Sequence, residues 1–499
     1  MKDFLESNDI NCNLYGVYLI KKYLKNNEIN DNTIDFLVNQ INTEYLLLFT
    51  SLFNKNNKKL SYDILYILIN IGFNNKGEQL FCSNEKIILN LATFLGKNKN
   101  DSYLLKNGIW LIRNIINNFE ICKLFLNFDI INFFEEIYER NLLDNDFMKR
   151  IILILRQLIK YKLFLKENKI DDDPTSLLPS IKIIKTQLRP NISSDLLYHY
   201  IYSLLELASF NSAEVYYEMI NNKIHKEIMN LYPLIIDHIK ELNIKIREYE
   251  PNINNNIFNQ KDKYDEYKKD LDNYNQIVLV MLKILGKIMS KEDGILTQIL
   301  LDSGIAQFLN RALQTTNVRI IKNVSFCISN ICAGTCGQVG NLLENNTLIE
   351  LIKVGKYIYE ALDYNHNIDN EYYKTLIDAF REINYVFSLA ISNSLYEKFV
   401  PIARYDNYTV VLILVKGLKI LNCQDLKILI DLILKAIYKL ILYDDEKKKD
   451  NNYISFKEVM ETNGVREYIE ILISNKDEEI ASEANKLYNS FFKDSNKNL

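Results

Sequence analysis

The only tryptophan of the chain, Trp110, lies four residues before an asparagine, Asn114. On an α-helix, residues four positions apart lie on one face, one turn from each other. This pair therefore places a flat indole beside an amide that both donates and accepts hydrogen bonds. We expect the amide to bind the backbone of an extended peptide, while the indole borders a slot for a long side chain.

The same spacing of an aromatic residue and an asparagine occurs twice more, as Tyr66 with Asn70 and as Phe326 with Asn330. Each pair alone is a weak signal, but Tyr66 precedes Trp110 by 44 residues. Periods of about 40–47 residues with two or three helices per unit are typical of armadillo and HEAT solenoids. The recurrence predicts stacked helical repeats whose concave surface carries the pairs.

The composition fits such an array. The chain has 48% hydrophobic and 25% charged residues, and its 14 Gly and 6 Pro leave few strand-turn signals in 499 residues. Apolar residues recur at steps of three and four, for example in 295–313 and 465–487, which is typical of helices. We predict an all-α fold, a right-handed armadillo-repeat superhelical solenoid of about ten repeats.

Several other classes of function are disfavoured. A net charge of −4 argues against direct nucleic-acid binding, which needs a strong basic field. The four histidines are dispersed and no phosphate loop or nucleophile elbow occurs, so we expect no enzyme, no catalytic residue and no cofactor. The seven cysteines match no metal-ligand spacing and indicate reduced thiols. The apolar runs are too short and too often broken by lysine to cross a membrane.

Three segments resemble the importin-α (karyopherin-α) family. Residues 324–334, Val-Ser-Phe-Cys-Ile-Ser-Asn-Ile-Cys-Ala-Gly, resemble a late repeat of that family. Residues 110–116 look like its Trp-Ala-Leu-Gly-Asn-Ile-Ala helix, and 456–492 are similar to its final repeat. The resemblance runs with gaps from about Tyr45 to Phe492.

The resemblance implies a nuclear import adaptor that works in cytoplasm and nucleus. In that family, basic nuclear-localisation peptides of cargo proteins lie extended along the concave face, at a major site in early repeats and a minor site in late repeats. Aromatic walls attract the cationic ends of such peptides. The positions that match these sites in this chain are Tyr66, Asn70, Trp110 and Asn114 for the major site, and Phe326, Asn330 and Tyr385 for the minor site.

Some positions depart from the family pattern. Asn118 replaces the aspartate that pairs with the key lysine of the cargo, and losing that charge weakens lysine selection. Leu153 and Gln157 replace the next Trp and Asn, and Leu389 replaces the Asn expected after Tyr385. These departures favour an alternative, an armadillo scaffold that binds a different protein partner and no longer carries import cargo.

We divide the chain into an N-terminal helical cap, residues 1–44, an armadillo array, 45–494, and a tail, 495–499. Loop insertions are expected near 240–275 and 361–373. The family implies importin-β and an export receptor as partners, but residues 1–44 lack the basic arm that recruits importin-β.

Overall fold

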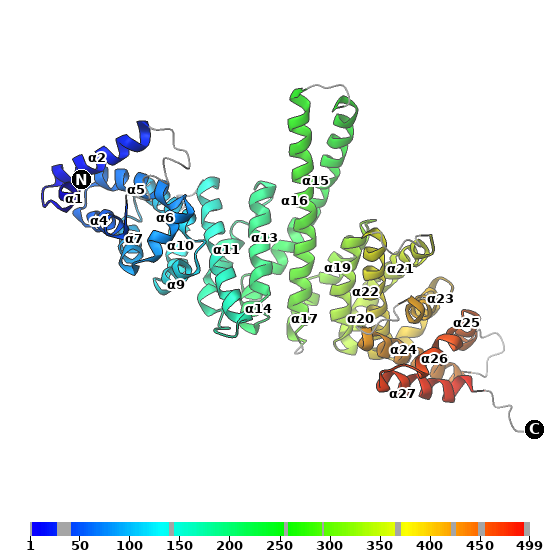
Figure 1. Cartoon of the computed structure of the whole chain (residues 1–499). Coiled ribbons are helices and arrows are strands. Elements are labelled where there is room, and N and C mark those ends of the chain that lie inside the picture. Colours follow the sequence, from blue (N-terminus) through cyan, green and yellow to red (C-terminus); the bar gives the residue numbers. More distant parts are fainter. Residues whose placement is uncertain are drawn as a thin grey trace, which may run out of the picture. The chain divides into compact units, whose positions relative to one another are not determined.

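The computed structural model describes residues 2–26, 41–138, 144–253, 258–291, 294–364, 371–420, 426–447 and 455–493. Within these ranges every regular element is a helix (Figure 1), so the predicted all-α class is confirmed. The chain forms two compact units. Unit 1 comprises residues 1–227 and 234–277, and unit 2 comprises residues 228–233 and 278–499.

Unit 1 begins with two helices before the first clear repeat and then continues in short helical sets. Its helices are α1 (Lys2–Glu6), α2 (Ile10–Asn26), α4 (Thr43–Ser51), η1 (Leu52–Lys55), α5 (Lys58–Gly72), α6 (Asn75–Cys82), α7 (Glu85–Lys97), α8 (Ser102–Ile115), α9 (Phe119–Asn127), α10 (Ile130–Tyr138), α11 (Asn145–Glu167), η2 (Thr175–Leu177), α12 (Pro179–Lys185), α13 (Ser194–Ala208) and α14 (Ala213–Asn221). Two long helices, α15 (Ile224–Ile253) and α16 (Phe258–Met289), contribute residues to both units.

Unit 2 continues the same pattern. Its helices are α17 (Ile295–Asp302), α18 (Ile305–Leu313), α19 (Val318–Cys332), α20 (Cys336–Glu344), α21 (Thr347–Tyr364), α22 (Glu371–Asn393), α23 (Tyr396–Ile420), α24 (Lys427–Lys447), α25 (Phe456–Thr462), α26 (Val465–Ile473), α27 (Glu478–Leu487) and the π-helical η4 (Tyr488–Phe492). Helix α23 is two helices joined at a bend, because residues 405–408 have non-helical backbone angles.

Helices group in sets of three, such as α6–α7–α8 and α17–α18–α19, and the third helices of neighbouring sets pack against each other. We call α2, α5, α8, α11 and α13 the unit 1 ladder. The unit 2 ladder consists of residues 278–289 of α16 with α19, α22, α24 and α27. This stacking of triplets is an armadillo-like repeat solenoid.

Acidic residues at the starts of two unit 1 ladder helices cap their own helix and pair with a lysine of the preceding ladder helix. Asp101 precedes α8 and accepts a hydrogen bond from the backbone N–H of Leu104 at 3.1 Å, which satisfies one of the free donors of a helix N-terminus. The same carboxylate pairs with Lys58 of α5 at 2.8 Å. Asp144 caps α11 and pairs with Lys106 of α8 in the same way. In each case the lysine holds the pKa of the aspartate below its ordinary value.

The region predicted as a loop insertion, 240–275, differs from that prediction. Its described residues belong to α15 and α16, which run side by side as a long pair (Figure 1). The rings of His238 and Tyr274 stack with centroids 5.6 Å apart, and Tyr249 meets Tyr267 edge-on at 5.6 Å. Charged side chains of this segment are exposed on both helices, so a highly charged composition is compatible with a helical pair.

The other predicted boundaries are only partly described. In the N-terminal segment, α2 packs against α5 as part of the unit 1 ladder. The second insertion spans the end of α21 and the start of α22, and its residues 365–370 lie outside the described residues, as does the tail. No described helix is both long enough and apolar enough to cross a membrane.

Candidate peptide-binding surface

All seven predicted site residues lie on third helices. Four belong to the unit 1 ladder, on α5 and α8, and three belong to the unit 2 ladder, on α19 and α22. Trp110 is 42% exposed. The others are half-buried: Tyr66, Asn70, Asn114, Phe326, Asn330 and Tyr385. Their side chains are therefore partly accessible, and they fall into two groups that belong to different units.

Two of the asparagines are held in the same way. The Nδ2 of Asn114 donates to the backbone oxygen of Ile69 on the preceding ladder helix, at 3.1 Å. The Nδ2 of Asn330 donates to the backbone oxygen of Gly286 on its preceding ladder helix, at 2.9 Å. Asn70 differs, because its Nδ2 donates to the oxygen of Tyr66 within its own helix at 2.6 Å. Of the three predicted asparagines, Asn114 and Asn330 are thus fixed between two ladder helices and Asn70 is not.

In unit 2 a glycine makes room for an aromatic wall. A Cβ atom added at Gly286 would lie 2.5 Å from the ring of Phe326. The ring of Phe326 therefore lies directly against the backbone of α16, next to the carbonyl that holds Asn330. Phe326 and Asn330 therefore both contact the backbone of the neighbouring helix at Gly286.

The aromatic rings of the unit 1 ladder carry cations of this same chain. The ammonium of Lys21 lies 5.6 Å from the ring centroid of Tyr66. The guanidinium carbon of Arg150 lies 4.3 Å from that of Trp110. Cation–π contacts have this geometry. The positions predicted to attract a cationic side chain of a ligand are therefore already occupied.

A further cation–π contact on the unit 1 ladder involves residues that were not among the predicted site residues. The guanidinium carbon of Arg156 lies 4.9 Å from the ring of Tyr202 on α13, and its Nη2 pairs with Glu206 at 2.9 Å. Tyr202 and Glu206 are four residues apart, with a carboxylate in place of the amide. A search for any aromatic residue followed by a polar residue at this spacing would have found them.

The carboxylates on the unit 1 ladder are also paired internally. Lys21 pairs with Asp63 of the next ladder helix, and Lys149 of α11 pairs with Asp195 of α13 at 2.6 Å. The bond from Lys149 lowers the pKa of Asp195 below its ordinary value. These carboxylates are consequently engaged before any basic ligand arrives.

The unit 2 ladder differs at its aromatic residues. Within the described residues, no cation of the chain lies over the ring of Phe326 or that of Tyr385. The side chain of Glu382, one turn before Tyr385, is 14% exposed, and its carboxylate pairs with Arg381 at 3.7 Å. Burial raises its pKa, and the nearby cations Arg381 and Lys322 act in the opposite direction.

The positions that depart from the family pattern have local roles. Asn118 caps α9, because its side chain accepts from the backbone N–H of Glu120 at 2.8 Å. Gln157 donates to the side-chain oxygen of Asn117 at 2.9 Å. Leu153 and Leu389 are half-buried. Because a leucine side chain is a hydrocarbon, neither offers a polar group to a ligand.

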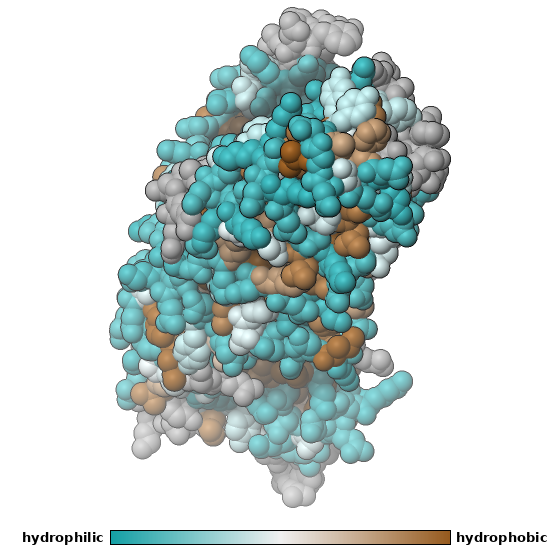
Figure 2. Space-filling model, turned by 90° about the vertical axis from the view of Figure 1, so that its left-hand side faces the viewer, coloured by the Kyte–Doolittle hydropathy of each residue, from teal (hydrophilic) through white to brown (hydrophobic). Residues whose placement is uncertain are grey.

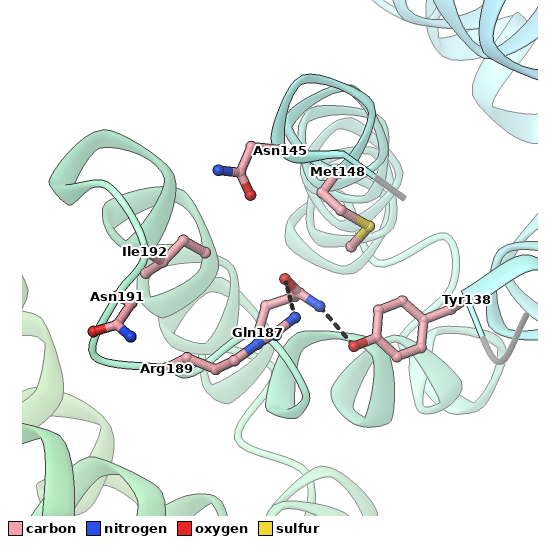
Figure 3. Close-up of a pocket in the computed structure, with 7 residues that line it drawn as sticks. All are labelled: Tyr138, Asn145, Met148, Gln187, Arg189, Asn191 and Ile192. Carbon is pink, nitrogen blue, oxygen red and sulfur yellow. Dashed lines mark hydrogen bonds between the residues drawn. The ribbon is translucent and has the colours of Figure 1, made fainter. Parts of the chain in front are cut away.

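Two cavities of unit 1 adjoin the ladder helices. The first has a volume of about 290 Å³ and is shown in Figure 3. Gln187 lines it, donates a hydrogen bond to the Tyr138 hydroxyl at 2.6 Å and accepts one from Arg189 at 3.2 Å. The second, about 400 Å³, lies between α11 and α13 beside Tyr202, with Leu163 and Leu205 in its wall. The second cavity offers a slot for a side chain next to the aromatic step. Within the described residues, no group of three or more His, Cys, Asp or Glu side chains is arranged to hold a metal ion.

No protein-family model and no curated protein matches this sequence. An engineered protein of known crystal structure is similar in fold, with a TM-score of 0.61 and 12% identity over 98% of this chain and 97% of its own. A designed armadillo repeat protein in complex with the peptide (KR)4 covers 62% of this chain and 99% of its own, with a TM-score of 0.41 and 16% identity. A computationally designed armadillo repeat protein for modular peptide recognition gives 0.40 and 17% over the same shares. At these identities, the first likeness shows a fold of stacked helical repeats and nothing finer.

Proposed function

We propose that this chain is a binding scaffold and that each of its two ladders holds a peptide in extended form. The observation that carries the proposal is the shared setting of Asn114 and Asn330. Each amide is anchored by one N–H to the preceding ladder helix. Its oxygen has no partner within the described residues.

An anchored amide of this kind suits a peptide backbone. The oxygen of Asn114 or Asn330 can accept the N–H of a peptide, and the second hydrogen on Nδ2 can donate to a peptide carbonyl. Each net hydrogen bond contributes about 0.5–1.5 kcal/mol. Because the anchoring bond already fixes the side-chain rotamer, less conformational entropy is lost when the peptide binds.

The finer proposal is that the scaffold is a nuclear import adaptor and that unit 2 binds the basic peptide of the cargo. It is supported by the aromatic faces of Phe326 and Tyr385, which carry no cation of the chain within the described residues. Glu382 lies one turn from Tyr385 and carries a partly desolvated carboxylate; it pairs with Arg381 at 3.7 Å, and a lysine or arginine of the peptide competes with Arg381 for it. On this proposal the protein works in cytoplasm and nucleus, and recruitment of importin-β does not use a basic arm within residues 1–44.

The alternative, a scaffold for another kind of partner, is favoured by one observation in unit 1. Arg150 lies 4.3 Å from the centroid of the Trp110 ring and also pairs with Asp146 at 2.6 Å. A basic peptide has to displace this arginine before it reaches the indole. We therefore assign basic cargo to unit 2 only.

The test is a fluorescence-anisotropy titration with a labelled bipartite basic peptide. We expect micromolar or tighter binding to the wild type and binding about fivefold weaker to Asn330→Ala, because one hydrogen bond is worth about 1 kcal/mol. The matched control is Asn323→Ala on the same helix, whose side chain is bonded to its own helix at Arg319; it should bind as the wild type does. Binding that is absent at tens of micromolar, or equal in the two variants, contradicts the assignment to unit 2.

A further inference from the structure

The surface above the unit 1 aromatic residues is cationic. Lys21, Arg150 and Arg156 each lie over an aromatic ring of the ladder, at 5.6, 4.3 and 4.9 Å from the ring centroid. A ligand approaching these rings first meets an ammonium or a guanidinium group, so an incoming lysine or arginine meets like charge. The three cations are nevertheless held in place, each by a carboxylate of the ladder or of its own helix.

One arginine in the middle of this row has no such carboxylate. Arg113 of α8 directly precedes Asn114 and is half-buried. No ion pair or hydrogen bond of its side chain exists within the described residues, and burial lowers its pKa. A partly desolvated guanidinium without a carboxylate is costly, and a ligand carboxylate can offset that cost with two parallel hydrogen bonds.

The charges around His199, a neighbour of Arg113 on the ladder, are mixed but mainly positive. His199 of α13 lies within electrostatic range of Arg113, Arg156, Lys149 and Asp195, and only the aspartate favours its charged form. That aspartate is already bonded to Lys149 at 2.6 Å. The one carboxylate of this group is therefore paired with Lys149, and burial alone acts on the pKa of Arg113, with no carboxylate among the described residues to balance it.

Among the described residues, the face shown in Figure 2 carries no broad apolar patch. In Figure 2, hydrophilic residues cover most of the face that is shown, and apolar residues occur among them in small groups. Exposed apolar residues scattered in this way are normal for a protein surface. Recognition at such a surface depends on charge and hydrogen bonding at particular side chains.

We propose that the unit 1 ladder binds an extended acidic peptide, with an aspartate or glutamate paired to Arg113 and the peptide backbone bonded to Asn114. This rests on the proposed peptide-binding role of the ladders but assigns to unit 1 a ligand of opposite charge to that of unit 2. Neighbouring acidic residues of the peptide pair with Arg150 on Trp110 and with Lys21 on Tyr66. Nucleic acid is the less suitable polyanion, because Asp63, Asp195 and Glu206 are interspersed with these cations.

The experiment titrates the full chain with a fluorescein-labelled peptide of ten residues that alternates Glu with small neutral residues. Trp110 is the only tryptophan, so its emission reports occupancy of the unit 1 ladder. We expect saturable binding that shifts the Trp110 emission, weakens with salt and falls about tenfold in Arg113→Gln. Arg247→Gln, which removes an exposed arginine of α15 in the same unit, is the matched control and should bind as the wild type does.

The charge reversal Arg113→Glu gives a second reading that does not depend on loss of binding. It should abolish binding of the acidic peptide and create binding of its lysine counterpart, with the helical circular dichroism unchanged. Equal binding of the acidic peptide to Arg113→Gln and the wild type overturns the proposal, as does competition by a single-stranded oligonucleotide at lower concentration than the peptide. If the basic peptide alone shifts the Trp110 emission, the charge assignment fails but the peptide-binding scaffold stands. If peptides of neither charge bind to either ladder, both fail.

Discussion

Removing Arg150, which covers the ring of Trp110, tests the cation–π contacts on the unit 1 ladder. Replacing Arg150 with alanine deletes a guanidinium 4.3 Å from the Trp110 ring centroid. A cation–π contact contributes about 0.5–1 kcal/mol when exposed and about 2 kcal/mol when desolvated. The Arg150 side chain is 21% exposed, so we take about 1 kcal/mol. Its pair with the exposed Asp146 adds less than about 0.5 kcal/mol.

The expected loss in the free energy of unfolding for Arg150→Ala is therefore about 1–1.5 kcal/mol, measured by urea denaturation. Because the indole becomes more accessible, acrylamide should quench the emission of Trp110 more strongly. A basic peptide no longer competes with Arg150, so its affinity for unit 1 should rise about fivefold, which corresponds to about 1 kcal/mol.

Two variants separate the contributions of stacking and ion pairing. Asp146→Asn removes only the ion pair and should leave the quenching of Trp110 unchanged. Arg150→Lys keeps the charge but loses the planar group, and should lie between alanine and wild type in quenching. If Arg150→Ala leaves emission, quenching and unfolding as in the wild type, then Arg150 does not cover the indole in solution and the reasoning is refuted.

Three further changes have calculable effects. Gly286→Ala forces a methyl group against the ring of Phe326, so we expect a loss of about 1–2 kcal/mol in urea unfolding and weaker binding of the basic peptide to unit 2. His225 is buried, and burial lowers its pKa to about 4. The unfolded chain, with a histidine pKa of about 6.5, binds a proton that the folded chain does not. Stability should thus be full above about pH 7.5 and fall by about 1.4 kcal/mol by pH 5.5, and His225→Leu should remove that part of the pH dependence. Lys439 donates to the backbone oxygens of Ile391, Ser392 and Ser394 at 2.7, 3.1 and 2.7 Å, so Lys439→Met should cost about 2 kcal/mol of unfolding free energy.

The glycine and lysine changes each have a matched control. Gly96→Ala introduces the same methyl group in α7 where nothing lies within 4 Å of it, and it should be neutral or slightly stabilising. Lys435→Met removes an exposed lysine paired with Asp431 one turn earlier on α24, and should cost less than about 0.5 kcal/mol. An equal cost for the two lysine variants would mean that Lys439 does not cap the end of α22. An unchanged pH dependence in the His225 variant would mean that this histidine titrates normally in the folded chain.

The fold was predictable from local signals. Apolar spacing and the 44-residue interval between Tyr66 and Trp110 identify helical repeats, since a repeat array buries its core between neighbouring sets. The segment 240–275 was predicted as a loop because its charge and asparagine content hide a helical pattern. Its helices are paired with each other through rings such as Tyr249 and Tyr267, and a reading of each segment by itself does not show such a pair.

The helix face on which each candidate residue lies was also predictable, but its surroundings were not. The spacing of Trp110 and Asn114 places both on one face of a helix, and both lie on the unit 1 ladder. Arg150 covers the indole because α11 packs against α8, although Arg150 and Trp110 are 40 residues apart in the chain. The same holds for the bond from Asn330 to the backbone of Gly286. On the proposals made above, contacts between neighbouring repeats set the ligand charge that each ladder accepts. The spacing of residues within one helix does not reveal such contacts.

The most direct test of the scaffold is a double-mutant cycle between the amide of Asn330 and the backbone of a bound basic peptide. Affinities are measured for the wild type and Asn330→Ala, each with the peptide and with versions N-methylated at one backbone nitrogen at a time. If the anchored amide reads the peptide backbone, one methylated position weakens binding to the wild type but not further in Asn330→Ala, with a coupling of about 1 kcal/mol. Purely additive effects at every position would contradict the account, because the amide would then make no bond to the backbone of the peptide.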